Sequence, residues 1–255
     1  METFLILLTV FIGSSLTLVS GFGLGTLLMP VMAIFFPLDT AILLTAWVHL
    51  ANNLIKFAFY YKHISWPILL RFAPTAIIGA YLGALILDYL KDWNSSLEVP
   101  ELHIQTSVFQ IILGFLLGLF AIIEWLPQEK RFSFPTSLLP IGGAVSGFFG
   151  GLSGHQGALR SAFLLRANLS KEVLIGTGIV IATCIDVTRI NHYLGTEKHE
   201  GILDNLPLFI QAVGVAFLGV FLTQRWIKKV TIAWLQKSIA IFLILFSIAM
   251  MLGWL

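Results

Sequence analysis

The run Gly-Phe-Phe-Gly-Gly-Leu-Ser-Gly at residues 147–154 interrupts an apolar stretch of the chain, and Ser-Gly-Phe-Gly-Leu-Gly at residues 20–25 does the same near the N-terminus. Each run leads into a short apolar segment, at 157–165 and at 25–36. A helix rises about 1.5 Å per residue, so about twelve residues cover about 18 Å and cannot cross a hydrocarbon core of about 30 Å. Each glycine run therefore predicts a broken, re-entrant helical hairpin.

The composition is that of a membrane protein. The sequence is 58% hydrophobic and 11% charged, whereas soluble domains are about 45–50% apolar and about 25% charged. We therefore predict an all-α, polytopic transmembrane helix bundle that forms a single domain, residues 1–255. The longer apolar runs that predict its helices lie at 3–20, 40–61, 66–88, 103–126, 137–150, 172–195, 205–225 and 231–254. The net charge is only +2 and the Lys and Arg residues are scattered, so no nucleic-acid partner is expected.

The glycine runs recur at corresponding places in the two halves, which indicates an internal repeat. The halves align when Gly25 is laid on Gly157. With one residue inserted in the next loop, two polar pairs coincide: Asn53 with Asp186, and Lys56 with Arg189. We therefore predict two repeats, 1 to about 126 and about 131 to 255, each a glycine-broken re-entrant hairpin followed by three spanning helices.

The basic residues in the loops predict the orientation of these repeats. If each hairpin returns to the side it entered from, ten of the 15 Lys and Arg residues share one face: Lys62, Arg71, Lys130, Arg131, Arg166, Lys171, Arg225, Lys228, Lys229 and Lys237. The other face receives only Lys91 and Lys198. Basic loops stay in the cytoplasm, so the first face is predicted to be cytoplasmic and both termini to lie on the opposite side. An odd number of full crossings separates the halves, which makes the repeats inverted.

The hairpin tips are the predicted anion site, because a helix N-terminus offers unpaired N–H groups and a positive dipole end. The residues concerned are Gly25, Thr26, Gly154, His155, Gln156 and Gly157. Arg160 follows Gln156 at i+4, so an amide and a guanidinium could grip one oxyanion. The alternatives are that the glycines serve helix packing, that His155 hydrogen-bonds a neighbouring helix and that Arg160 reaches the cytoplasmic surface.

The second long segment of each half carries further polar residues at helical spacing. His49, Asn52, Asn53 and Lys56 form a stripe on one helix face in the first half. Thr183, Asp186 and Arg189 do so in the second. Ionisable residues within a membrane normally face the bundle interior, so we assign His49, Lys56, Asp186 and Arg189 to ion coupling or gating, and Asn52 and Asn53 to substrate binding. The alternatives are a structural Asp186–Arg189 ion pair, interfacial Lys56 and Arg189, and asparagines that only join helices.

No enzyme signature is present. The sequence lacks a nucleophile elbow, a His-Glu-x-x-His motif and a phosphate-binding loop, so it predicts neither an enzyme nor a cofactor or metal site. Without a nucleotide-binding loop, uphill transport requires an ion gradient or a partner ATPase. His49, His155 and Asp186 are the candidate proton-handling groups.

The motifs together resemble the TauE/SafE family of anion permeases, also called the sulfite exporter family. The resemblance rests on Ser-Gly-Phe-Gly-x-Gly-Thr at residues 20–26 with Pro30, and on Gly-Gly-Leu-Ser-Gly-His-Gln-Gly-Ala-Leu-Arg-Ser at residues 150–161. It implies transport of sulfite, a sulfonate or a related anion in the cytoplasmic membrane of a prokaryote. Many members continue the second motif to a proline, whereas here His155-Gln156 and Arg160-Ser161 stand in its place.

The predicted function is a secondary transporter that carries a small anion by alternating access, with one repeat rocking against the other. A passive anion channel is the first alternative and an intramembrane enzyme the second. The expected partners are the anionic substrate, the lipid bilayer, protons as a coupling ion and a second copy of the chain in a homodimer.

Overall fold

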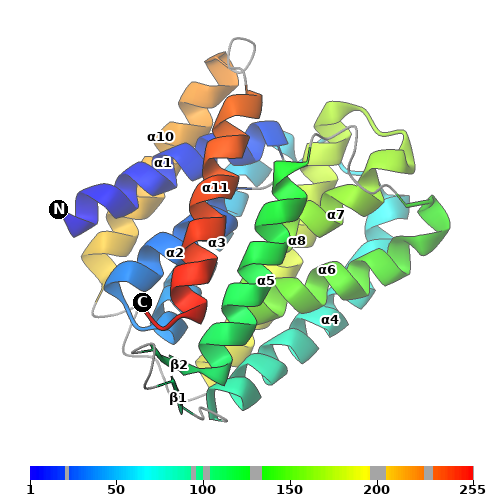
Figure 1. Ribbon diagram of the computed structural model, residues 1–255. Coiled ribbons are helices and arrows are strands. Elements are labelled where there is room, and N and C mark those ends of the chain that lie inside the picture. The colour runs from blue at the N-terminus through cyan, green and yellow to red at the C-terminus, as the bar shows by residue number, and fades with distance from the viewer. Residues whose placement is uncertain are drawn as a thin grey trace. The chain divides into compact units, whose positions relative to one another are not determined.

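A computed structural model describes residues 1–20, 23–92, 96–99, 104–126, 134–195, 205–226 and 232–254. The described chain is almost entirely helical, as predicted (Figure 1). Its α-helices are α1 Glu2–Ser20, α2 Leu24–Phe35, α3 Leu38–Tyr60, α4 Trp66–Asp92, α5 Val108–Trp125, α6 Leu139–Ser153, α7 Gly157–Leu164, α8 Lys171–Gly195, α10 Leu206–Trp226 and α11 Ile232–Met251. Short 3-10 turns, η3 Thr136–Leu138 and η4 Leu165–Ala167, flank α6 and α7.

The long helices have the length and hydropathy of membrane spans. Within the described residues five segments meet both conditions: Leu38–Tyr60, Trp66–Lys91, Val108–Trp125, Lys171–Gly195 and Leu206–Thr223. Large apolar side chains such as Leu70, Phe115 and Leu245 are exposed, whereas polar and charged side chains such as Asn52, Asp186 and Arg189 are buried. Apolar outside and polar inside is the arrangement of a protein whose solvent is lipid, so this is a multi-pass membrane protein.

The chain forms two compact units, which are described separately. The larger unit comprises Met1–Ala84 and Phe132–Lys229, and the smaller comprises Leu85–Arg131 and Val230–Leu255. In the smaller unit α5 packs on α11, and a Cβ atom at Gly114 would lie 2.6 Å from Met251 Cγ. The unit also holds an antiparallel ribbon that the sequence analysis did not foresee, β1 Ser96–Val99 with β2 Ile104–Ser107. Within the apolar run at 103–126, residues 104–107 therefore form a strand, and the helix begins at Val108, where the N-cap Ser107 forms a capping box with Gln110.

Both glycine runs break the helix where predicted. In the larger unit α6 ends at Ser153 and is capped by Gly154, which has a left-handed φ of 82°, and α7 begins at Gly157. Phe134, which precedes η3 and α6, stacks on Phe163 near the end of α7 at 4.4 Å between ring centroids, so the chain before α6 lies beside the end of α7. The chain therefore turns back on itself, as a hairpin requires. The first run shows the same break, with α1 ending at Ser20 and α2 beginning after Gly23, whose φ is 133°.

The glycines of α6 also pack against α4. A Cβ atom at Gly143, Gly147 or Gly151 would lie within 2.0–2.2 Å of a backbone carbonyl oxygen of α4. No side chain fits that space, so the two backbones are in direct contact along a seam of small residues. Within the second glycine run the packing alternative is therefore realised for Gly147 and Gly151, Gly143 packs in the same way, and Gly154 forms the turn. The inverted relation of the two halves stays a prediction.

A buried cationic cluster as candidate anion site

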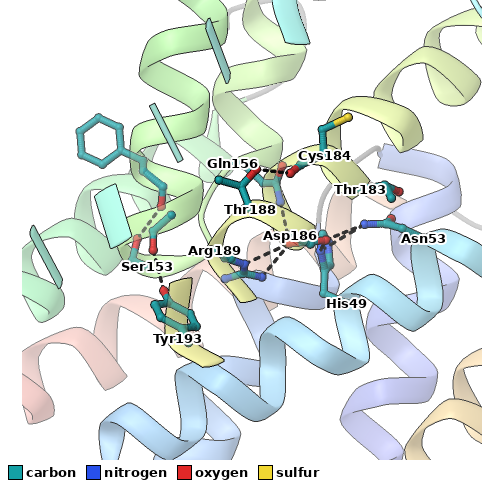
Figure 2. Close-up of polar contacts among 12 residues, drawn as sticks. His49, Asn53, Ser153, Gln156, Thr183, Cys184, Asp186, Thr188, Arg189 and Tyr193 are labelled. Carbon is teal, nitrogen blue, oxygen red and sulfur yellow. Dashed lines mark hydrogen bonds and ion pairs between the residues drawn. The ribbon is translucent and has the colours of Figure 1, made fainter. Parts of the chain in front are cut away.

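The carboxylate of Asp186 is the centre of a polar cluster inside the larger unit. It lies on α8, is fully buried, and faces α3 and the break between α6 and α7. Figure 2 shows side chains from these three elements directed at it. Helices α3 and α8 pack together along much of their length, so polar residues at helical spacing on each converge on one another.

Five hydrogen bonds saturate the two oxygens of Asp186. Oδ2 lies 2.6 Å from His49 Nδ1 and accepts a hydrogen bond of 3.0 Å from Asn53 Nδ2. Oδ1 accepts from Gln156 Nε2 at 3.1 Å, and from Arg189 Nε at 3.1 Å and Nη2 at 2.8 Å. A carboxylate offers about four lone-pair sites. Asp186 is therefore held as an anion by groups drawn from α3, α8 and the second hairpin.

Gln156 extends the cluster to Arg160. Its Nε2 donates to Asp186, while its Oε1 accepts a hydrogen bond of 3.3 Å from Arg160 Nη1. The guanidinium packs against α8 at Gly178, where a Cβ atom would lie 3.4 Å from Arg160 Nε, an ordinary van der Waals contact. The predicted pairing of Gln156 and Arg160 at i+4 is thus present in the structure. Arg160 is buried and does not reach the cytoplasmic surface, so that alternative is wrong.

The cluster has more positive than negative charge. Lys56, Arg160 and Arg189 are all at most 7% exposed, and Asp186 is the carboxylate they share. With neutral histidines the formal sum of these four groups is about +2. The Lys56 ammonium has no hydrogen bond or ion pair within the described residues. Uncompensated buried charge is costly in a membrane, so the cluster is suited to receive an anion.

Two of the sequence alternatives are settled by these positions. Lys56 and Arg189 are 3% and 1% exposed, so neither is interfacial. Their side chains turn inward because the cluster supplies the electrostatic partner. The predicted Asp186–Arg189 ion pair exists, at 2.8 Å between Oδ1 and Nη2. It is one edge of a larger network rather than an isolated neutral pair.

Asn52 is buried without a hydrogen bond. Its side chain is fully buried, and neither Oδ1 nor Nδ2 has a partner among the described residues. It follows His49 by three positions and precedes Lys56 by four, so it lies on the same face of α3 as both. An unsatisfied buried polar group costs about 1–3 kcal/mol. The amide of Asn52 therefore has free capacity for a polar guest beside Lys56.

The two hairpin breaks meet at this cluster. A Cβ atom at Gly25 would lie 3.4 Å from the carbonyl oxygen of Gly154 and 3.7 Å from His49 Cδ2. A Cβ atom at Gly154 would lie 3.0 Å from Arg189 Nη1. Gly154 combines this close approach with a positive φ of 82°, which favours glycine, whereas a Cβ atom at Gly25 would make only ordinary van der Waals contact. The predicted tips at Gly25 and Gly154 thus lie against the residues that surround Asp186.

The remaining predicted tip residues differ in their contacts. The Gln156 N–H donates to the Gly154 carbonyl at 3.0 Å, so Gln156 offers its side chain rather than its backbone. His155 is buried, and its Nδ1 lies 3.0 Å from Ser153 Oγ rather than against Asp186. Thr26 is buried and Gly157 half-buried, at the starts of α2 and α7.

The sequence analysis missed residues that support or extend the cluster. Tyr193 donates a hydrogen bond of 2.6 Å to the Gly151 carbonyl and so ties α8 to the end of α6. Ser146 donates to the Gln156 carbonyl at 3.1 Å. Thr45 is buried, and its hydroxyl has no partner among the described residues. Thr45 and Tyr193 each lie four residues from a predicted site residue, His49 or Arg189, so extending the stripes by one turn would have found them.

Comparison with known proteins agrees with this picture. A family model described as Sulfite exporter TauE/SafE matches residues 5–250. The chain belongs to this family. The TauE/SafE match covers nearly the whole chain, both glycine breaks included, and confirms the resemblance carried by the motifs. No curated protein and no solved structure gives a match.

Membership in a family of sulfite exporters indicates a membrane transporter of sulfite or another anion rather than an enzyme. The described part of this TauE/SafE chain, polar cluster included, holds no group of three or more His, Cys, Asp or Glu side chains placed to bind a metal ion.

Proposed function

We propose that the protein is a secondary carrier for a small oxyanion, sulfite or a sulfonate, and that the anion binds at the cluster around Asp186. The observation that carries this proposal is the buried excess of positive charge, in which neither the Lys56 ammonium nor the Asn52 amide has a hydrogen bond among the described residues. Charge-assisted hydrogen bonds from ammonium and guanidinium groups suit the oxygens of a sulfur oxyanion. The family match supports the same class of substrate.

The proposed seat lies between Lys56, Asn52 and the start of α2, with Gln156 and Arg160 facing it from the second hairpin. Gly25 would contribute an N–H group that precedes the first helical hydrogen bond of α2, from Leu27 to Gly23, and Thr26 would line the seat. The walls of the proposed anion seat would be formed by Asn53, Gly154, His155 and Gly157. Asp186 and Arg189 would orient the side chains that donate hydrogen bonds to the anion. Alternating access would expose the seat to each side in turn.

Flux of radiolabelled sulfite into proteoliposomes tests the proposal. We expect saturable uptake in the wild type, and an apparent affinity about 10- to 100-fold weaker in Lys56→Met, because a hydrogen bond to a charged group is worth about 1.5–3 kcal/mol. Asn52→Leu and Arg160→Ala should weaken it in the same way. The matched control is Lys62→Met, since Lys62 is an exposed lysine in the same region and its loss should leave flux unchanged.

The same vesicles separate a carrier from a channel. A carrier preloaded with unlabelled sulfite accelerates entry of labelled sulfite by counterflow, whereas a channel does not. Undiminished flux in both Lys56→Met and Arg160→Ala would contradict the proposed seat. Absence of any sulfite flux in the wild type, together with flux of another small anion, would contradict the proposed substrate.

A further inference from the structure

We propose that His49 takes up one proton with each bound anion, which makes the carrier an anion–proton symporter. This inference rests on the proposed function, because it assigns the coupling ion to the same site. It follows from the position of the imidazole ring, which lies between the carboxylate of Asp186 and the glycine at the start of α2.

One edge of the ring faces Asp186. The distance of 2.6 Å joins His49 Nδ1 to Asp186 Oδ2, which also accepts from Asn53 Nδ2. An ionised carboxylate only accepts hydrogen bonds, so Nδ1 carries the hydrogen. In the neutral ring the lone pair must then be on Nε2.

The other edge of the ring faces the proposed anion seat. A Cβ atom at Gly25 would lie 3.7 Å from His49 Cδ2 and 3.9 Å from Nε2. A lone pair on Nε2 repels an incoming oxyanion, whereas a protonated Nε2 donates a charge-assisted hydrogen bond to it. The step is a simple addition: a proton from water binds Nε2 as the anion enters, and leaves to water when the anion leaves, with no bond broken in the anion.

The charged groups around the ring decide when the proton binds. Asp186 on α8 contacts the ring at Nδ1, and Lys56 on α3 and Arg189 on α8 are the basic side chains buried in the same cluster. The second hairpin adds His155 and Arg160, and neither α2 nor residues 206–223 of α10 carries a titratable side chain. Without an anion the surplus of positive charge disfavours a further proton. An anion removes that surplus, so anion and proton bind with positive and reciprocal coupling.

Titration calorimetry of the purified full-length protein with sulfite tests this coupling. The titration is run in two buffers of different ionisation enthalpy, at an alkaline pH where sulfite is fully deprotonated and cannot itself supply the proton. We expect about one proton taken up per anion in the wild type, and a dissociation constant that rises up to about tenfold per pH unit, as linkage of one proton requires.

His49→Asn is the informative variant, because its amide can donate to Asp186 from the place of Nδ1 but does not titrate. It should bind sulfite with no proton uptake and a dissociation constant that does not change with pH. His49→Gln, which keeps an amide near the position of Nε2, provides a second non-titrating variant if His49→Asn is unstable. His63→Asn is the control: His63 is exposed between α3 and α4, and its loss should leave proton uptake unchanged.

The outcomes separate the two proposals. Sulfite binding without proton uptake in the wild type overturns the coupling but not the anion site. Equal proton uptake in the wild type and both His49 variants overturns the role of His49. No sulfite binding by a wild-type protein that is folded, as judged by its thermal melt, contradicts the proposed function itself.

Discussion

Asp186 shows how one buried charge organises its surroundings. The carboxylate receives donors from residues that are 137, 133, 30 and 3 positions away in the sequence. Each donor is itself costly to bury, and each is tolerated because the carboxylate is there. Asp186 therefore acts as a resident anion that holds the cationic groups in place beside the seat proposed for the substrate.

Replacement of Asp186 by asparagine should be strongly destabilising. The change keeps the size of the side chain but leaves His49 and Arg189 without a carboxylate, and loss of one partner of a buried pair costs about 3–5 kcal/mol. Thermal melts in detergent measure the effect. The double variant Asp186→Asn with Arg189→Met should recover part of the loss, because it removes the orphaned guanidinium as well. Additive losses in the double variant would show that the ion pair is not coupled.

At the scale of elements, the glycines have two separate tasks. Gly143, Gly147 and Gly151 recur every four residues and face the backbone of α4. Gly23 and Gly154 adopt positive φ and form the breaks. The close packing of α6 on α4 holds the second hairpin in position, so that Gln156 reaches Asp186.

Substitution in the seam should test this division. A Cβ atom at Gly147 would lie 2.0 Å from the Ala76 carbonyl oxygen, so Gly147→Ala forces the helices apart and should cost about 1–3 kcal/mol. Gly214→Ala is the matched control, because Gly214 lies within a helix and nothing lies within 4 Å of its Cβ position. That change should be neutral or stabilising by up to about 1 kcal/mol, since alanine is the better helix former. Equal melting temperatures for the two variants would argue against a tight seam.

At the scale of the whole molecule, the distribution of basic loops predicts which way the chain lies in the membrane. The loop between α3 and α4, with Lys62, is assigned to the cytoplasm, and the ribbon that follows α4 to the opposite side. This orientation would place the two glycine-broken hairpins in inverted positions, entering from opposite faces.

Labelling of single cysteines tests the orientation. In a Cys184→Ser background, which removes the one native cysteine, His63→Cys should react with a membrane-impermeant maleimide only from the cytoplasmic side. Ser96→Cys, in the exposed first strand of the ribbon, should react only from outside. Labelling of both cysteines from the same side would exclude the three-span arrangement in the first repeat.

The lipid environment, most helix bounds, the glycine breaks and the family could all be predicted from the sequence, because hydrophobicity, helical spacing and glycine conformation are local properties. The sequence also placed His49, Asn53, Gln156 and Asp186 among the site residues by their type and spacing. Only the folded chain shows that His49, Asn53 and Gln156 meet on the carboxylate of Asp186, since that depends on how α3 packs on α8. The inward orientation of Lys56 and Arg189 likewise follows from the tertiary structure. A long cationic side chain near a helix end can reach either the surface or the interior, and the choice depends on the partner that packing brings beside it.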